Sequence, residues 1–559
     1  MTTAILDVPP TLSPRLEQLH PTLTPAQMAR IAAHGRVRRV RQGDVLVEHG
    51  EQTSRFFVVA GGRIEAVRPM GGAEQLVATL QPGMFTGEAS LLSGRRSLSR
   101  IRASEAGTVI EVDRDDLLGI VQIDGELGEI LLRSFILRRL QLIAHGIGDA
   151  VVIGSSHCSG TLRVREFLTR NGHPYSFVDL DRDSGVQELL DRINISPGDV
   201  PVVICRCTVV LRNPTNQQIA DCLGFNDAID QTQLRDLVVI GAGPAGLAAA
   251  VYAASEGLDV LVLETNAPGG QAGSSSRIEN YLGFPMGISG QELASRAYTQ
   301  AQKFGAQLLI AHGATRLTCD RRPYTIEMED GTRIPARTVI IATGAEYRRL
   351  PLANLAQFEG AGVYYAATFI ESQLCKADEV IVVGGGNSAG QAAVFLAQWC
   401  ARVHMLVRGE CLASNMSRYL IRRIEQTSNI ALRLRTEITE LDGERHLERV
   451  HWVDKPSGRF ETHAIRHLFA MTGAVPSTQW LAGCLALDGN GFIKTGTDLT
   501  PEDLSAKEWP VGRAPYPLET SLPAVFAVGD VRGGSVKRAA SAVGEGSVAV
   551  SGVHHVLGE

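Results

Sequence analysis

Residues 237–246 read LVVIGAGPAG, an uncharged apolar run that leads into three closely spaced glycines. Gly241 permits a tight turn, Gly243 lets the backbone approach a pyrophosphate, and Gly246 lets the next helix pack close to a sheet. That helix begins at Pro244 and Ala245 and would direct unpaired N–H groups at the phosphates. The stretch therefore predicts a strand, a turn and a helix that bind a dinucleotide.

A carboxylate follows at the expected distance. Glu264 ends the next strand, LVLE, where it can accept a hydrogen bond from a ribose hydroxyl. The uncharged run from Leu237 to Ser255 is roughly nineteen residues long, which is the length of a membrane span. Because Pro244 and the glycines interrupt it, we expect a buried strand and helix and no membrane partner.

A second unit of the same kind lies further along the chain, where the strand Glu379–Val383 leads into GGGNSAG. The next strand, Val403–Val407, ends at Arg408 and carries no acid there. A guanidinium suits a 2′-phosphate, which favours NADPH, with NADH as the alternative. The predicted turn and helix start consist of Gly384, Gly386, Asn387, Ser388 and Ala389.

Composition narrows the class of protein. A chain of 559 residues predicts roughly three or four domains. A net charge of −6 argues against a nucleic-acid partner, and the first residues lack a secretory signal, so we expect a cytoplasmic protein. The nine cysteines are scattered without CxxC spacing, which predicts buried small side chains and neither a disulfide framework nor a metal site.

Short alternating segments from about 35 to 125 predict an all-β barrel or roll. They include Val45–Val47, Arg55–Val59, Arg63–Val67 and Thr108–Val112. A helix over 126–145 follows, and either a dimer helix or the closing helix of the domain fits its pattern.

The next segment predicts a small α/β domain. Strands over Ala150–Ile153, Ser176–Asp179 and Val202–Cys205 alternate with helices over Thr161–Arg170 and Val186–Ile193. A polar linker, 226–233, leads to the first glycine turn.

From 229 to 559 the chain resembles the low-molecular-weight thioredoxin reductases of the class II pyridine nucleotide-disulfide oxidoreductases. The resemblance implies an FAD domain in two halves, 235–352 and 478–559, with an NADPH domain, 353–477, inserted between them. It also implies a homodimer formed through the FAD domains. The motifs that carry it are PGGQ at 268–271, Asn280, GFPMGISG at 283–290, ATG at 342–344, AVGDVR at 527–532 and KRAASAVGEG at 537–546.

The resemblance also implies roles for individual residues around FAD. Asp530, preceded by Gly529, would lie beside the ribityl chain and phosphate. Lys537, Arg538 and Ala539 would approach the isoalloxazine. Gly270, Gln271, Asn280, Thr343 and Gly344 would line the flavin.

Two departures from the family put its usual electron acceptor in doubt. The redox CATC of the family aligns by spacing with Ala367, Thr368, Phe369 and Ile370, and without a thiolate no exchange can occur there. Cys375 lies five residues beyond Ile370, but no second cysteine stands beside it in the sequence to form a redox pair. The phosphate motif of the NADPH domain keeps only Arg408, for which Arg418 or Arg422 are the candidate substitutes.

The middle segment, 148–228, resembles a glutaredoxin-like thioredoxin fold, with Val200-Pro201 at its cis-proline. Cys158 then takes the place of the attacking cysteine and Thr161 that of the resolving one, which gives a monothiol site. A thiol ahead of a helix N-terminus is a good nucleophile. The alternative is a docking domain with an incidental cysteine.

The N-terminal segment, 1–147, resembles a cyclic-nucleotide-binding domain. Its phosphate cassette would be FTGEASLLSGRRSLSR at 85–100, with Gly87 behind the phosphate and Glu88 on the ribose hydroxyl. Ungapped spacing puts Ser97 where the family has its phosphate-binding arginine, and Arg96 lies one place earlier. A cyclic nucleotide is therefore a candidate partner.

The fold class is thus multidomain: a β-roll, a thioredoxin-fold domain and a flavoprotein with two dinucleotide-binding domains. We predict an FAD-dependent, NAD(P)H-oxidising reductase of the thioredoxin reductase type with a non-standard acceptor. That acceptor is the chain's own Cys158, a ferredoxin-like protein or a small oxidant. The alternative is a ligand-sensing flavoprotein with little turnover.

Overall fold

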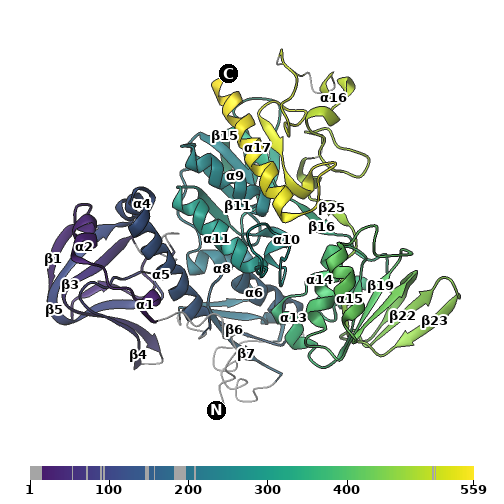
Figure 1. The fold of residues 1–559 in the computed structure, drawn as a ribbon, viewed down its shortest axis with the longest axis horizontal. Helices are drawn as coiled ribbons and strands as arrows, with labels where there is room; N and C mark the ends of the chain where they lie inside the picture. The colour runs from purple at the N-terminus through teal and green to yellow at the C-terminus, as the bar shows by residue number, and fades with distance from the viewer. Residues whose placement is uncertain are drawn as a thin grey trace.

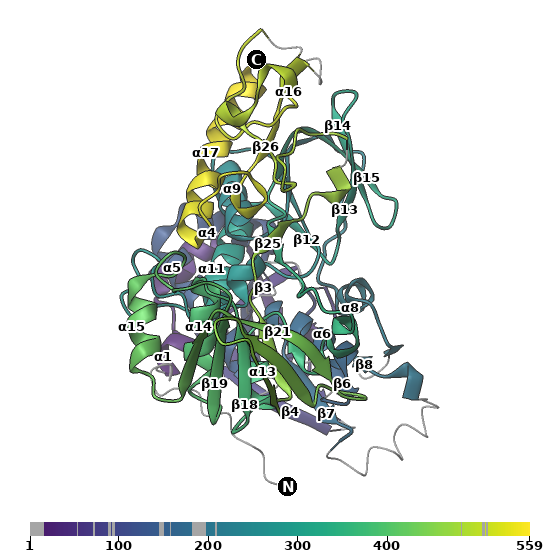
Figure 2. The ribbon, with the colours of Figure 1, turned by 90° about the vertical axis from the view of Figure 1, so that its right-hand side faces the viewer.

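The computed structural model describes residues 16–52, 54–70, 73–87, 91, 95–144, 150–156, 158–181, 197–206, 209–481, 483–505, 509 and 512–559. Three regions are arranged around a central, mostly parallel sheet (Figure 1). The N-terminal roll lies on one side of this sheet, a small mixed sheet lies below it, and a second parallel sheet lies on the other side. The C-terminal helix α17 and the small sheet are at opposite ends of the molecule (Figures 1 and 2).

The N-terminal region is an antiparallel roll in which β2 pairs with β5 beside the strand order β1-β5-β3-β4. The two strands predicted at 55–59 and 63–67 are one long strand, β3. The residues between them, around Gly61 and Gly62, form bulges in the pairing with β5 and no turn. The elements are α1 (Leu16–Leu19), α2 (Pro25–Ala32), β1 (Arg36–Val40), β2 (Val45–Val47), β3 (Arg55–Met70), β4 (Ala73–Leu80), β5 (Arg100–Asp113), α4 (Arg114–Ile123) and α5 (Gly125–Ala144).

The middle region is a four-stranded sheet in the order β7-β6-β8-β9. β6 is parallel to β7 and antiparallel to β8, and β9 is antiparallel to β8. The helix expected over 186–193 lies outside the described residues. The elements are β6 (Ala150–Gly154), α6 (Ser159–Arg170), β7 (Tyr175–Asp179), β8 (Val202–Cys205), β9 (Val209–Arg212) and α8 (Asn216–Leu223).

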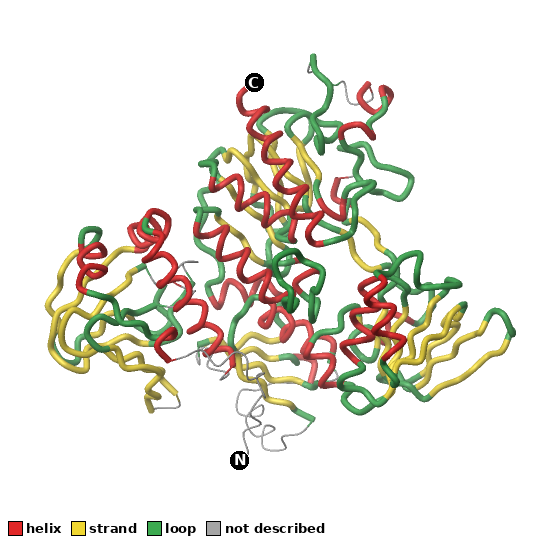
Figure 3. Tube along the Cα trace, in the orientation of Figure 1, coloured by secondary structure: helices red, strands yellow, loops and turns green. Residues whose placement is uncertain are grey.

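The central sheet has seven strands, of which β10, β11, β12, β15 and β26 are parallel. Helices α9, α11 and α17 lie side by side in front of it (Figure 3). The uncharged run 237–255 is divided between β10 and α9, as predicted. Within the described ranges, no helix has both the length and the apolar character to cross a membrane. The elements are β10 (Arg235–Ile240), α9 (Pro244–Ser255), β11 (Val260–Glu264), α10 (Gly270–Gly273), α11 (Gly290–Lys303), β12 (Gln307–Ile310), β13 (Ala314–Thr318), β14 (Tyr324–Met328), β15 (Arg333–Ile341), α16 (Pro501–Ser505), β26 (Val525–Ala527) and α17 (Ala539–Gly558).

The second parallel sheet has the order β17-β24-β18-β19-β20, and a three-stranded sheet packs beside it. A two-stranded ribbon, β16 with β25, connects this region to the central sheet. The elements are β16 (Ala345–Tyr347), α12 (Leu355–Phe358), β17 (Val363–Tyr364), α13 (Phe369–Leu374), β18 (Glu379–Val383), α14 (Asn387–Leu396), β19 (Arg402–Val407), α15 (Arg418–Gln426), β20 (Ile430–Leu434), β21 (Thr436–Asp442), β22 (Arg449–Asp454), β23 (Arg459–His463), β24 (His467–Ala470) and β25 (Ala474–Pro476).

The cysteines correct one expectation. Cys319 and Cys484 form a disulfide that joins the end of β13 to the segment before β26, so two of the scattered cysteines are paired. Their separation of 165 residues hid this contact in the sequence. Cys375 and Cys400 are both buried, and their Sγ atoms lie 3.5 Å apart.

Candidate functional site

The first glycine turn lies where three distant segments of the central sheet meet. Gly241 has a positive φ of 103° and touches the Ala342 backbone, while a Cβ on Gly246 would overlap the Gly241 oxygen. Gly529 packs on the other side, since a Cβ there would lie 3.0 Å from the Cβ of Ala245. The turn, the 342–344 segment and the 529–530 segment therefore surround the N-terminus of α9.

Gly243 and Gly270 face each other across the opening of this turn. Gly270 has a positive φ of 52°, and a Cβ there would lie 3.0 Å from the Cα of Gly243, so a side chain is disfavoured at Gly270. The backbone of α9 begins here, with Gly243 as its N-cap and Pro244 and Ala245 as its first residues. The opening thus offers unpaired N–H groups and no side chains, which fits a pyrophosphate.

Glu264 is buried and supports the turn itself. Its Oε2 accepts a hydrogen bond from the Ala242 N–H at 2.7 Å, and its Oε1 accepts from Asn266 at 2.9 Å and Ala267 at 3.2 Å. A carboxylate has about four acceptor positions, so one remains for a ribose hydroxyl. The sequence predicted only the ribose contact.

Asp530 places a half-buried carboxylate at this site. Its carboxylate makes no hydrogen bond to any residue that the structure describes, and burial raises its pKa, against the opposing charge of Lys537. Lys537 Nζ donates to the backbone oxygen of Asp530 at 3.1 Å. A half-buried carboxylate without a partner fits the hydroxyl donors of a ribityl chain.

The remaining flavin candidates surround the same opening. Gln271 Nε2 donates to the Ala345 oxygen at 2.5 Å, and Thr343 Oγ1 donates to the Ser477 oxygen at 3.0 Å. The Ser477 N–H donates to the Gly344 oxygen at 3.2 Å, so Thr343 and Gly344 contact the residue that ends the predicted NADPH domain. Arg538 is the N-cap of α17 and Ala539 its first residue, whereas Asn280 is exposed in the loop before α11.

The second glycine turn precedes α14, whose N-cap is Gly386. A Cβ on Gly384 would lie 3.0 Å from the Cβ of Ala389, and Asn387 Oδ1 accepts from the Ser417 N–H at 2.8 Å. Arg408 is exposed just beyond β19 and has no ion pair within the described part of the chain. Arg418 and Arg422 are also exposed, on α15. An unpaired cation at this strand end fits a 2′-phosphate.

Tyr347 lies within electrostatic range of both Ser388 and Asp530, and sequence reasoning missed it. The residue is on the ribbon strand β16, and Ser388 is at the start of α14. Burial raises its pKa, and the nearby negative charge of Asp530 raises it further. No motif marks this tyrosine, because its role follows from where the ribbon places it.

Cys158 is the half-buried N-cap of α6. The loop before it is fixed by two carboxylates: Ser156 Oγ donates to Asp179 at 2.6 Å, and Ser155 Oγ donates to Asp181 at 2.8 Å. Gly160 packs on Pro201, whose peptide bond is cis as predicted. Burial lowers the pKa of Arg163, and the charge of Cys158 acts in the opposite direction, so guanidinium and sulfur lie within electrostatic range.

The helix that begins after Cys158 packs against α13. Leu162 lies in one apolar cluster with Ala367 and Ile370, which are 8% and 9% exposed. Ser159 touches the backbone of Gly360, where a Cβ would lie 2.6 Å from that of Ser159. Thr368 is the N-cap of α13, and Phe369 is half-exposed. The 367–370 segment therefore packs in one apolar cluster with the helix that begins after Cys158.

The cassette of the roll is partly described. Gly87 has a φ of 97°, and its oxygen accepts from Arg138 Nη1 of α5 at 2.7 Å. Glu88 lies outside the described residues. Ser97 Oγ donates to the Ser99 oxygen at 2.7 Å, and Arg96 donates to the Gly50 oxygen at 3.0 Å while packing against Gly224 of the middle region.

Comparison with known proteins agrees with this geometry. The sequence profile of the family described as "Pyridine nucleotide-disulphide oxidoreductase" matches residues 235–546, and that described as "Cyclic nucleotide-binding domain" matches 37–124. The thioredoxin reductase of Bacillus subtilis is 30% identical over 332 residues, which cover 59% of this chain and 97% of that protein. That of Ureaplasma parvum is 33% identical over 320 residues, covering 57% and 95%.

Solved structures give the same result. Thioredoxin reductase from T. acidophilum superposes with a TM-score of 0.52 at 28% identity, and that from Lactococcus lactis with 0.52 at 27%. Each match covers 58% of this chain and 99% of the other. The chain is therefore multidomain, with a cyclic-nucleotide-binding domain ahead of a fold with two dinucleotide-binding domains. It belongs to the pyridine nucleotide-disulphide oxidoreductase family, as an enzyme homologous to the thioredoxin reductases.

Proposed function

We propose that this enzyme uses NADPH to reduce a disulfide substrate through Cys158. The Cys158 thiol attacks R–S–S–R, releases R–SH and forms the mixed disulfide Cys158–S–S–R. The reductive step is then NADPH + H⁺ + Cys158–S–S–R giving NADP⁺ + Cys158–SH + R–SH. Bound FAD would supply the carrier for the two electrons. The observation that carries the proposal is the packing of the Cys158 helix α6 on α13, where Ala367 and Ile370 stand in place of a redox pair.

The cofactors are supported by the sites rather than by the fold alone. Gly243 and Gly270 leave room for a pyrophosphate, Asp530 lacks a partner, and Glu264 keeps one acceptor position. The exposed Arg408 favours NADPH over NADH. Tyr347 would hold the nicotinamide turn beside the flavin site through Ser388.

The middle region supports the role of Cys158. Its strand order, with one antiparallel strand, and Pro201 beside the first turn of α6 match the glutaredoxin-like thioredoxin fold that the sequence resembles. Thr161, at the resolving position, has no thiol and is fully buried, so the electrons that reduce the mixed disulfide would have to come from bound FAD. The domain boundaries at 147–148 and 228–229, and a cytoplasmic location, stay predictions.

Rapid mixing of the FAD-loaded enzyme with NADPH tests the first half of the proposal, and bleaching of the flavin absorbance is the expected result. The second half requires NADPH oxidation with a small mixed disulfide as acceptor. Cys158→Ser should abolish disulfide reduction and leave flavin bleaching intact, whereas the exposed Cys411→Ser should change neither. A flavin that stays oxidised, or unchanged turnover in Cys158→Ser, would contradict the proposal.

A further inference from the structure

Arg95 of the roll is buried in the middle region. It is 6% exposed, and its Nη1 donates to the backbone oxygen of Asn171 at 3.0 Å. Its guanidinium carbon lies 4.4 Å from the centre of the Phe225 ring, and Nη2 lies 3.4 Å from the hydroxyl of Tyr298. No carboxylate among the described residues contacts it, so neutral groups alone fix its position.

Asn171 is the C-cap of α6, and this end of the helix is a junction of three regions. Asn171 Nδ2 donates to the Asn266 oxygen beside the first glycine turn at 3.1 Å. From the roll, Arg139 Nε donates to the oxygen of Gly172 at 2.8 Å. Arg95 thus acts on the same short segment that α6 uses to contact the flavin region.

The opposite end of α6 carries Cys158. The helix is 12 residues long and continuous, so its two ends move together. Of the neighbouring cassette residues, Arg96 packs on Gly224, the C-cap of α8, and Ser97 donates to the Ser99 oxygen. Arg95 therefore contacts the end of α6, whereas Arg96 contacts the end of α8.

We propose that Arg95 is a positioning residue for the Cys158 helix: it fastens the C-terminal end of α6 to the roll and does not bind a ligand phosphate. Without this side chain, the C-terminal end of α6 is held less tightly against the roll. The first turn of the helix, which carries Cys158, then becomes more mobile. The proposal depends on the place of Cys158 on α6 and not on its role as a relay.

The test compares Arg95→Ala and Arg95→Lys with Arg100→Ala in the full-length, FAD-loaded protein. Arg100 is a suitable control because it lies on the roll and pairs with Glu48 and Glu74, at 2.7 and 2.6 Å. In Arg95→Ala, hydrogen exchange of the α6 amides and alkylation of Cys158 should both become about tenfold faster. Arg95→Lys, which keeps the charge and the fold, should give an intermediate rate, and Arg100→Ala the wild-type rate.

Two results would overturn the proposal. One is that the α6 amides of both Arg95 variants exchange hydrogen at the same rate as those of Arg100→Ala. The other is calorimetric binding of cyclic AMP to the wild type that Arg95→Ala abolishes while α6 exchange stays unchanged, which would make Arg95 a phosphate ligand. Failure of the relay itself would appear only in turnover and leave both readouts unaffected.

Discussion

Arg170 of α6 donates a hydrogen bond of 2.7 Å from Nη2 to the backbone oxygen of Gly270, in the loop that faces the first glycine turn. A side chain of the middle region thus supports the flavin site. Arg170→Ala should weaken FAD binding about tenfold, because a charge-assisted hydrogen bond to the loop is lost. Titration of the apoprotein with FAD, followed by flavin fluorescence, measures the change.

Arg165→Ala is the matched control, since Arg165 lies on the same helix but stacks on Phe177, with 4.0 Å between its guanidinium carbon and the ring centre. Equal FAD affinity in the two variants would show that Gly270 is held without Arg170.

The groove between α9 and α11 predicts a dimer. It has a volume of about 560 Å³, and Leu247, Val251 and Phe304 are among the apolar side chains that line it. Leu282, in the loop at its rim, is 92% exposed. A second copy of the chain would cover this surface, so Leu282→Asp should shift the protein toward monomer in sedimentation velocity. Leu76→Asp, at an exposed position of the roll, should leave the sedimentation unchanged. A wild-type protein that sediments as a monomer would contradict the predicted dimer.

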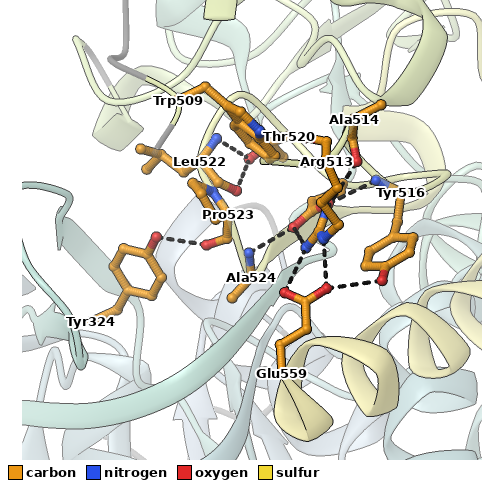
Figure 4. Close-up of polar contacts among 11 residues, drawn as sticks. Tyr324, Trp509, Arg513, Ala514, Tyr516, Thr520, Leu522, Pro523, Ala524 and Glu559 are labelled. Atoms are coloured by element: carbon orange, nitrogen blue, oxygen red, sulfur yellow. Dashed lines mark hydrogen bonds and ion pairs between the residues drawn. The ribbon is translucent and has the colours of Figure 1, made fainter. Parts of the chain in front are cut away.

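Arg513 pairs with two carboxylates, one buried before β26 and one at the end of the C-terminal helix. Arg513 Nη1 lies 2.7 Å from Glu519, which is fully buried. Arg513 Nε lies 2.6 Å from Glu559 (Figure 4). Arg513→Ala leaves Glu519 without its counter-charge and should lower the free energy of unfolding by about 3 kcal/mol in urea titration. Arg459→Ala, whose side chain is 75% exposed, should change it by less than about 0.5 kcal/mol. Equal midpoints for both variants would contradict this account.

Sequence reasoning found the features that depend on local backbone geometry. The strand β10 and helix α9 follow from the glycine spacing around Gly241, because a tight turn and close packing need those residues at those places. Contacts between segments far apart left no such pattern. Tyr347 lies near two distant segments, Arg170 crosses from one region to another, and Cys319 pairs with a distant Cys484.

Cysteine reactivity should separate the exposed thiols from the buried pair. The pKa of Cys375 is raised by the hydrogen bond to Cys400 and by burial. Its thiol therefore stays protonated, and a protonated thiol is a poor nucleophile. Iodoacetamide should therefore label Cys411 and Cys158 in the native protein, and Cys375 only after unfolding. The same hydrogen bond lowers the pKa of Cys400, so burial alone protects this thiol until the protein unfolds. Peptide mass spectrometry of samples taken over time measures the labelling rate of each cysteine. Rapid native labelling of Cys375 would show that it is accessible and a candidate redox group.

A buried carboxyl on α13 should make stability depend on pH. Glu371 is 6% exposed, and burial raises its pKa, although it accepts hydrogen bonds from the Thr368 N–H, at 2.8 Å, and from the Thr368 hydroxyl. The native state therefore binds this proton more tightly than the unfolded state. Its contribution to stability is complete below the unfolded pKa and is lost as the pH rises through the native pKa.

Glu371→Gln removes this titration and keeps an acceptor for Thr368. Thermal unfolding at pH 5 and pH 8 should then show a smaller loss of Tm with rising pH in Glu371→Gln than in the wild type, and a higher Tm than the wild type at pH 8. Glu444→Gln, at an exposed position, should follow the wild type because water solvates that carboxylate in both states. The same pH dependence in all three proteins would mean that Glu371 is ionised in the native state and that its contact with Thr368 stabilises the charge.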